Sequence, residues 1–273
     1  MAKKLLNREP TKTGRWLLGI IPFALLVIFY VYQSNLRLAE NPEDKLLPAF
    51  SSIADAIERY GFTEDKRTGE FLMLNDTVSS LKRLAIGVGI SAAIALVFGV
   101  VNGVIPLVRA NLSPLITAIS LVPPMAILPV LFIIFGLGEL SKIVLIAIGI
   151  TPFLLRDMQQ RVIEIPREQF IKAQTLSANT WQVILRVVLP QVMPRLLASV
   201  RLSLGAAWLF LIAAEAIAST DGLGYRIFLV RRYLAMDVIL PYVAWITLLA
   251  FFIDLVLRKV SHWLYPWFHA EGS

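Results

Sequence analysis

The stretch IKAQTLSANTWQVILRVVLP, residues 171–190, decides how this chain is organised. It lies in a polar segment of 40 residues, 156–195, between two hydrophobic stretches. Two spanning helices need only a few residues to connect them, so we expect this segment to have a task of its own. Its pattern predicts a short helix over Glu168–Leu176, a break at Ser177–Asn179 with a left-handed or strongly bent backbone, and a second helix capped by Asn179 or Thr180.

The composition is that of a membrane protein. The chain has 273 residues, 57% of them hydrophobic, and a mean hydropathy of +0.71. About 20 apolar residues cross the roughly 30 Å hydrocarbon layer. We predict an all-α protein with six transmembrane helices, over 16–32, 84–107, 112–135, 141–155, 197–218 and 238–257. No cleavage site follows Tyr32, so the first helix is not expected to be a cleaved signal peptide.

Charge placement predicts the orientation and argues against a nucleic-acid partner. Part of the net charge of +7 precedes the first span, at Lys3, Lys4, Arg8, Lys12 and Arg15. Together with an even number of spans, this basic lead-in places both termini and the segment 156–195 in the cytoplasm.

Prolines interrupt the third predicted span at positions 123, 124 and 129. Proline removes a backbone donor and bends a helix. Within a bilayer, broken backbone is tolerated mainly where protein or a water-filled cavity surrounds it. The prolines therefore indicate either a helix that lines a translocation path or a kink kept for packing.

Small residues mark one face of the second span. Gly87, Gly99 and Gly103 allow a neighbouring helix to approach closely, which predicts a packed helix pair.

The segment 156–195 resembles the loop by which permease subunits of ABC importers contact their ATPases: Glu-Ala-Ala, three residues, Gly, nine residues, Ile-x-Leu-Pro. With Ser177 in the glycine position, Val187, Leu189 and Pro190 fall in frame, while Ile171 replaces the glutamate. Leu121–Lys142, and Ala214-Glu215 followed by Gly222-Leu223-Gly224-Tyr225, are similar to segments of nitrate/taurine-type permeases. The resemblance covers roughly residues 76–260.

This resemblance implies a MetI-like permease in the bacterial inner membrane. Residues 1–75 would hold the cytoplasmic lead, the first helix and an external loop, 76–260 the permease core, and 261–273 a cytoplasmic tail. The implied partners are a second copy of the chain, two ATP-binding subunits and a soluble substrate-binding protein. The Asn41-Pro42 to Leu47-Pro48 loop and Arg231–Asp237 are most similar to permeases encoded beside urea- or guanidine-carboxylating enzymes, which suggests such a solute.

Two sets of site residues follow from these observations. The predicted ATPase-coupling residues are Arg167, Glu168, Lys172, Ala173, Gln174, Ser177, Ala178 and Asn179. The predicted path or gate residues are Pro123, Pro124, Met125, Trp208 and Glu215. For Glu215, the prediction is a structural role beside the Gly222–Gly224 turn near an external gate, with substrate contact as the alternative. An amphipathic hairpin lying on the lipid surface is the alternative for the coupling segment.

Other classes of function are weakly supported. Both histidines lie in the C-terminal tail, there are no cysteines, and neither a nucleophile motif, a metal-ligand motif nor an ATP-binding glycine-rich loop is present. We therefore predict neither an enzyme nor a cofactor. A stand-alone secondary transporter or channel, or a membrane-anchored scaffold, remains as an alternative; a secondary transporter would be expected to show inverted repeats or several intramembrane charges, and neither is visible.

Overall fold

The computed structural model describes residues 11–41, 44–65 and 69–270, and within these it contains helices and no β-strand, as predicted. The long helices are α1 (Lys12–Glu40), α3 (Leu72–Val104), α6 (Glu139–Ile163), α9 (Leu189–Ala218) and α11 (Met236–Leu264). The shorter elements are α2 (Phe50–Ile57), η2 (Glu58–Phe62), α4 (Pro106–Ser120), η3 (Pro124–Ile127), α5 (Leu128–Phe135), α7 (Arg167–Thr175), α8 (Thr180–Val183), η4 (Ile184–Val188), α10 (Leu223–Arg231) and α12 (Pro266–Ala270).

The centre of the molecule is the close pair α3 and α6, and glycine makes it possible. A Cβ atom added to Gly99 would lie 2.5 Å from the Cβ of Met158, and one added to Gly103 would lie 2.4 Å from the Cβ of Val162. Gly87 lies on the same face, where an added Cβ would also clash with α6. The predicted small-residue packing face is therefore confirmed, since α3 and α6 can approach this closely only while these positions lack side chains.

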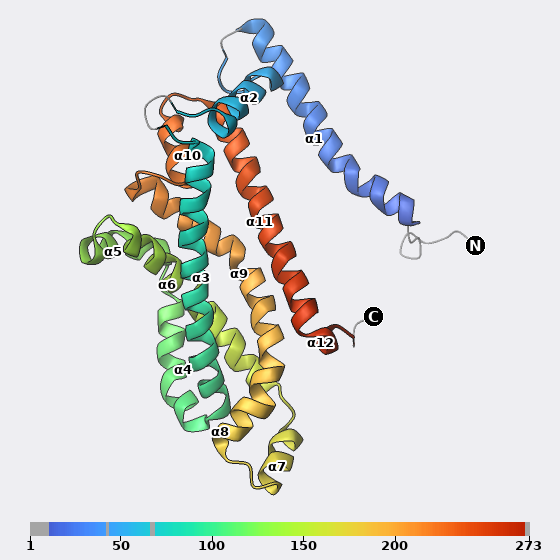
Figure 1. Ribbon diagram of the computed structural model, residues 1–273, viewed down its shortest axis with the longest axis vertical. Helices are drawn as coiled ribbons and strands as arrows, with labels where there is room; N and C mark the ends of the chain where they lie inside the picture. Colours follow the sequence, from blue (N-terminus) through green and yellow to red (C-terminus); the bar gives the residue numbers. More distant parts are fainter. Residues whose placement is uncertain (1–10, 42–43, 66–68, 271–273) are drawn as a thin grey trace.

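The remaining helices surround this pair (Figure 1). Helix α9 packs on α6, and α11 runs beside α9, whereas α1 stands apart from the bundle along most of its length. α1 is tied to the segment before α2, because Tyr30 donates to the carbonyl of Pro48 at 2.8 Å and Ser34 to that of Leu47 at 2.9 Å. We call the end that carries α7 and α8 the hairpin end, and the opposite end the α10 end.

Four helices are long and apolar enough to cross a membrane: Thr13–Glu40, Leu72–Val104, Thr180–Ala218 and Met236–Leu264. Helices α4 and α5 form a fifth candidate if the bent pair is one span. The predicted fourth span lies in α6, which has 25 residues but is not among these candidates. A multi-pass membrane protein is thus supported, and the count of six stays a prediction.

The predicted third span, 112–135, needs a correction. It is two helices, because α4 ends at Ser120 and the chain then turns through 79° before α5. Pro124 and Pro129 each lie in the first turn of the element that follows, η3 or α5, where a missing N–H costs nothing. The prolines therefore separate two helices rather than bend one.

Candidate coupling hairpin and translocation path

The turn after α7 has a left-handed backbone at Ser177, where φ is 60°. The Ser177 N–H donates to the carbonyl of Gln174 at 2.9 Å, and the Ala178 N–H donates to that of Ala173 at 3.0 Å. These two bonds form the Schellman arrangement that ends helices, in which glycine is the usual left-handed residue. The predicted break and the predicted backbone conformation at position 177 are both confirmed.

Asn179 caps the next helix. Its side-chain oxygen accepts from the N–H of Gln182 at 2.8 Å, and the Gln182 side chain accepts from the N–H of Asn179 at 2.9 Å. This reciprocal capping box satisfies two N-terminal donors of α8. Since α8, η4 and α9 follow one another without a break, the turn is connected directly to a helix that reaches the far end of the bundle.

Apolar residues fix the inner side of the hairpin, defined here as residues 164–188. They form a small core with α3 and α6 that contains Val100, Val162, Ile165, Val183, Ile184, Val188 and Val192. Residues 156–163 belong to α6 and 189–195 to α9. The two ends of the predicted segment 156–195 therefore lie in the long helices α6 and α9, and the part that projects as a hairpin is residues 164–188.

The outer side of the hairpin exposes most of the predicted coupling residues. Exposed are Arg167, Glu168, Lys172, Gln174, Ser177 and Asn179, while Ala173 and Ala178 are half-buried under the turn. The prediction left out three exposed hydrophobic side chains: Ile171 is 57% exposed, Leu176 83% and Trp181 65%. The signal that could have found them was available, since such residues are unexpected in a polar segment.

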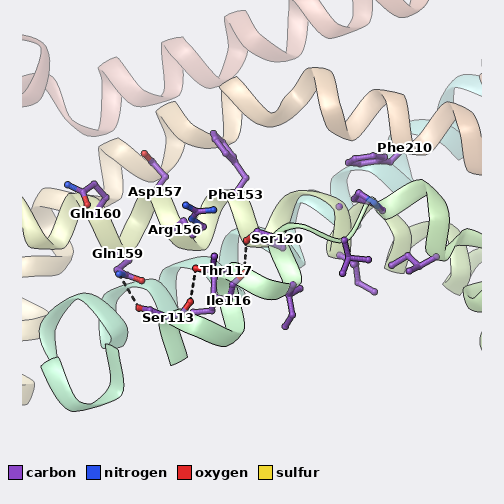
Figure 2. Close-up of a pocket in the computed structure, with 17 residues that line it drawn as sticks. Ser113, Ile116, Thr117, Ser120, Phe153, Arg156, Asp157, Gln159, Gln160 and Phe210 are labelled. Carbon is purple, nitrogen blue, oxygen red and sulfur yellow. Dashed lines mark hydrogen bonds between the residues drawn. The ribbon is translucent and has the colours of Figure 1, made fainter. Parts of the chain in front are cut away.

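A cavity of about 820 Å³ opens beside the broken segment, between α4, η3, α6 and α9. Figure 2 shows Gln159 of α6 directed at Ser113 of α4, to which its amide nitrogen donates at 3.5 Å, and Arg156 of α6 lines the same cavity. The same side of α4 carries Ser113, Thr117 and Ser120, each one helical turn from the next.

The predicted path residues are not all found together. Pro124 lines this cavity, and Pro123 and Met125 lie exposed beside it at the break. Trp208 is 5% exposed and packs in the core, and Glu215 is fully buried at the α10 end. Neither Trp208 nor Glu215 is among the residues that line the cavity.

The buried side chain of Arg83 is the hub of an ionic network at the α10 end. Its guanidinium donates to both carboxylate oxygens of Glu139 at 2.6 and 2.7 Å, to Glu215 at 2.7 Å and to Asp221 at 2.5 Å. Asp221 lies in the loop after α9. Burial raises its pKa, but hydrogen bonds from Ser79 and Arg83 outweigh this, so that its pKa lies below the usual value. One guanidinium thus connects α3, α6, α9 and the loop that leads to α10.

The same network holds the Gly222–Gly224 turn. The Glu215 carboxylate accepts from the Gly224 N–H at 2.9 Å and from the Ser80 hydroxyl at 2.8 and 3.0 Å. The Asp76 carboxylate accepts from the Gly222 N–H at 2.9 Å. Gly222 has φ 111°, and a Cβ there would lie 2.6 Å from the Glu215 carboxyl carbon, so a side chain is excluded twice over. The predicted bond between Glu215 and this turn is present.

Sequence reasoning missed most of this network. Asp76 also accepts from Arg226 at 2.8 Å and from the Tyr242 hydroxyl at 3.1 Å. These partners of Asp76 lie about 150 residues further along the chain, and no local sequence pattern predicts contacts between residues so far apart.

Comparison with known proteins assigns the chain to a family. The sequence model of one family, the binding-protein-dependent transport system inner membrane components, matches residues 85–270 of this chain. The taurine transport system permease protein TauC of Escherichia coli (strain K12) is 37% identical over 193 residues, which are 71% of this chain and 70% of that protein. The putative aliphatic sulfonates transport permease protein SsuC of Bacillus subtilis (strain 168) is 33% identical over 154 residues, 56% of each protein.

A solved structure supports the fold. A chain from an inward-facing form of the MetNI methionine ABC transporter superimposes with a TM-score of 0.63 at 19% identity, over 72% of this chain and 98% of that one. This chain therefore belongs to the binding-protein-dependent transport system inner membrane components, as the permease subunit of an ABC importer of the nitrate/taurine type, and is not an enzyme.

Proposed function

We propose that the hairpin is the element by which this permease docks on its ATP-binding subunit. The observation that carries the proposal is the hairpin tip, where a turn of fixed conformation between two helices exposes Ile171, Leu176 and Trp181. Exposed apolar clusters with a charged surround are typical of surfaces that a partner covers. Arg167, Glu168 and Lys172 supply that surround, and Glu168 stands one turn before the position where related loops carry their glutamate.

The complete importer that we propose contains two copies of this chain and two ATP-binding subunits at the hairpin end. A soluble substrate-binding protein would dock at the α10 end, facing the outside of the bacterial cytoplasmic membrane, and both termini would be cytoplasmic. The basic lead-in and the position of the hairpin support this orientation.

Rigid connections make the hairpin a suitable lever. Helices α6 and α9 run from the hairpin to the network around Arg83, and the glycine contacts lock α3 to α6. A displacement of the hairpin would thus move these three helices together, as in a rigid-body transition. The segment between α4 and α5 is not part of the rigid group formed by α3, α6 and α9. We therefore propose that Pro123, Pro124 and Met125, in that segment, form the part of the translocation path whose conformation changes during transport. Trp208 and Glu215 would then support the path from within the packed core.

Co-purification tests the docking role. We expect the wild-type chain to bring down its ATP-binding subunit in equal amount, and a Leu176→Glu, Trp181→Glu variant to lose it while still inserting in the membrane. Tyr233→Glu is the matched control, because Tyr233 is 70% exposed at the opposite end. Equal recovery of the ATP-binding subunit with the double variant would contradict the proposal and favour a hairpin that lies on the lipid surface.

A further inference from the structure

We propose that α12 is a pH-sensitive clamp on the start of α9, which is held while His269 is neutral and released when His269 is protonated. This inference rests on the proposed function, because the helix that α12 holds is the one that leaves the hairpin. It gives a regulatory role to the two histidines, which docking of the ATP-binding subunit does not use.

Two parallel imidazole rings join α12 to α11. His262 of α11 and His269 of α12 are the only histidines in the sequence, and their rings stack with centroids 3.6 Å apart and planes 4° from parallel. Two positive charges at this separation would repel each other strongly. The pair therefore cannot hold a proton on each ring and stay stacked.

Hydrogen bonds hold both rings in place. The Nδ1–H of His262 donates to the carbonyl of Arg258 at 2.8 Å, because a carbonyl can only accept. Nε2 of His269 lies 3.1 Å from the hydroxyl oxygen of Ser261, a buried residue of α11. The ring of His269 is thus fixed to α11 both by stacking and by a polar contact.

The charges around the stack disfavour a proton on His269. The charged and titratable groups near the two rings are Asp254, Arg258, Lys259 and Tyr265 on or directly after α11, and Arg195 and Arg201 on α9. Asp254 is the one carboxylate in this described group, and both of its oxygens accept from Arg201, at 2.7 and 3.0 Å. The excess of positive charge therefore favours the neutral imidazole.

The pKa of His269 in docked α12 lies below its usual value, because partial desolvation and the charges of His262 and Arg201 disfavour the imidazolium. In released α12 the pKa returns to about 6.5. By linkage, a histidine whose pKa is lowered by docking stabilises the docked state above about pH 6.5, and this stabilisation is lost as the pH falls below that value. Neutral pH therefore holds α12, and mild acidification releases it.

Docked α12 in turn holds α9. The guanidinium carbon of Arg195 lies 5.3 Å from the centroid of the Phe268 ring, which is a cation–π contact. Arg195 lies about two turns of α9 beyond Val188, the last residue of the hairpin. The contact thus ties the first turns of α9 to α11 through α12. Its release would free the helix that we propose to transmit motion from the hairpin.

A nitroxide attached at Trp267→Cys reports whether α12 is held. The chain has no cysteine, so this thiol is its only one, and Trp267 is half exposed on α12. With the label attached before assembly and the complex in nanodiscs, we expect slow nitroxide motion at about pH 7.5 and fast motion at about pH 5.5. A label at Tyr233→Cys, at the α10 end, should move equally at both pH values. A label at position 267 that does not respond to this change in pH would overturn the clamp.

Two variants at position 269 test whether charge is the cause. His269→Gln, which is neutral at every pH, should keep the motion slow at about pH 5.5, and His269→Lys should show fast motion already at about pH 7.5. Fast motion in the glutamine variant, or slow motion in the lysine variant, would contradict the role of the proton. Glu271→Gln, at a position outside the described residues, is the control for a nearby acidic group and should respond to pH like the wild type.

ATP hydrolysis in the absence of solute shows whether the clamp acts on α9. At about pH 7.5 we expect it to be roughly fivefold faster with His269→Lys than with His269→Gln, at the lower end of typical coupling between sites. Both complexes are compared at one pH, so the pH dependence of the ATP-binding subunit cancels. Equal rates would overturn the action on α9. Failure of the wild-type chain to bring down the ATP-binding subunit would instead overturn the docking proposal, and the nitroxide would still report the state of α12 in the permease.

Discussion

Replacing Ser177 by proline should uncouple ATP hydrolysis from transport while leaving the spanning helices inserted. Position 177 has φ 60°, whereas proline fixes φ near −65°. Proline also removes the N–H that donates to the carbonyl of Gln174. The lost hydrogen bond costs about 1 kcal/mol and the incompatible backbone about 3 kcal/mol, so the native turn would become roughly 700-fold less populated.

Ser177→Gly is the informative partner variant. A left-handed backbone costs an L-residue about 1–2 kcal/mol, and glycine avoids this cost. The glycine variant should therefore keep the turn, with coupling equal to that of the wild type or slightly better. If any change at position 177 disturbed coupling, the reasoning from backbone conformation would be wrong.

The assay is substrate-stimulated ATP hydrolysis by the purified complex in nanodiscs. We expect stimulation to be lost, or the ATP-binding subunit to be released, in Ser177→Pro only. Full stimulation of ATP hydrolysis in the proline variant would refute the proposal that the hairpin acts as a lever, because the turn would then not be needed to transmit motion.

Three further predictions follow from the packing. The Glu215→Gln variant should insert in the membrane, but its free energy of unfolding should fall by about 3 kcal/mol and its uptake rate should change, because the substitution breaks a buried charge pair. An uptake rate equal to that of the wild type would show that the charge of Glu215 has no role in transport. Gly103→Ala should lower the thermal unfolding midpoint in detergent, since its Cβ meets α6, whereas Gly89→Ala, with open space around it, should not. Single cysteines at Lys172 and Tyr233 should be labelled from opposite sides of intact membranes. If an impermeant reagent added outside the cells modified position 172 first, the proposed orientation would be wrong.

Local features were predicted well because their causes are local. The left-handed turn at Ser177, the cap at Asn179 and the close glycine face of α3 each depend on residues within one or two helical turns. The bond between Glu215 and the following turn was also predicted, because the two are 9 residues apart.

Features that depend on distant partners could not be predicted in this way. Arg83 is 56 residues from Glu139 and 132 from Glu215, and nothing near it in the sequence reports these contacts. The prolines predicted a bend, but the 79° turn depends on how η3 and α5 pack on α6.

Site-directed cross-linking tests the central claim most directly. A thiol-reactive photo-cross-linker at Leu176→Cys, in membranes that hold the whole complex, should attach to the ATP-binding subunit, and the same reagent at Tyr233→Cys should not. Attachment from position 233, or only lipid adducts from position 176, would contradict the assignment of the hairpin as the contact with the ATPase.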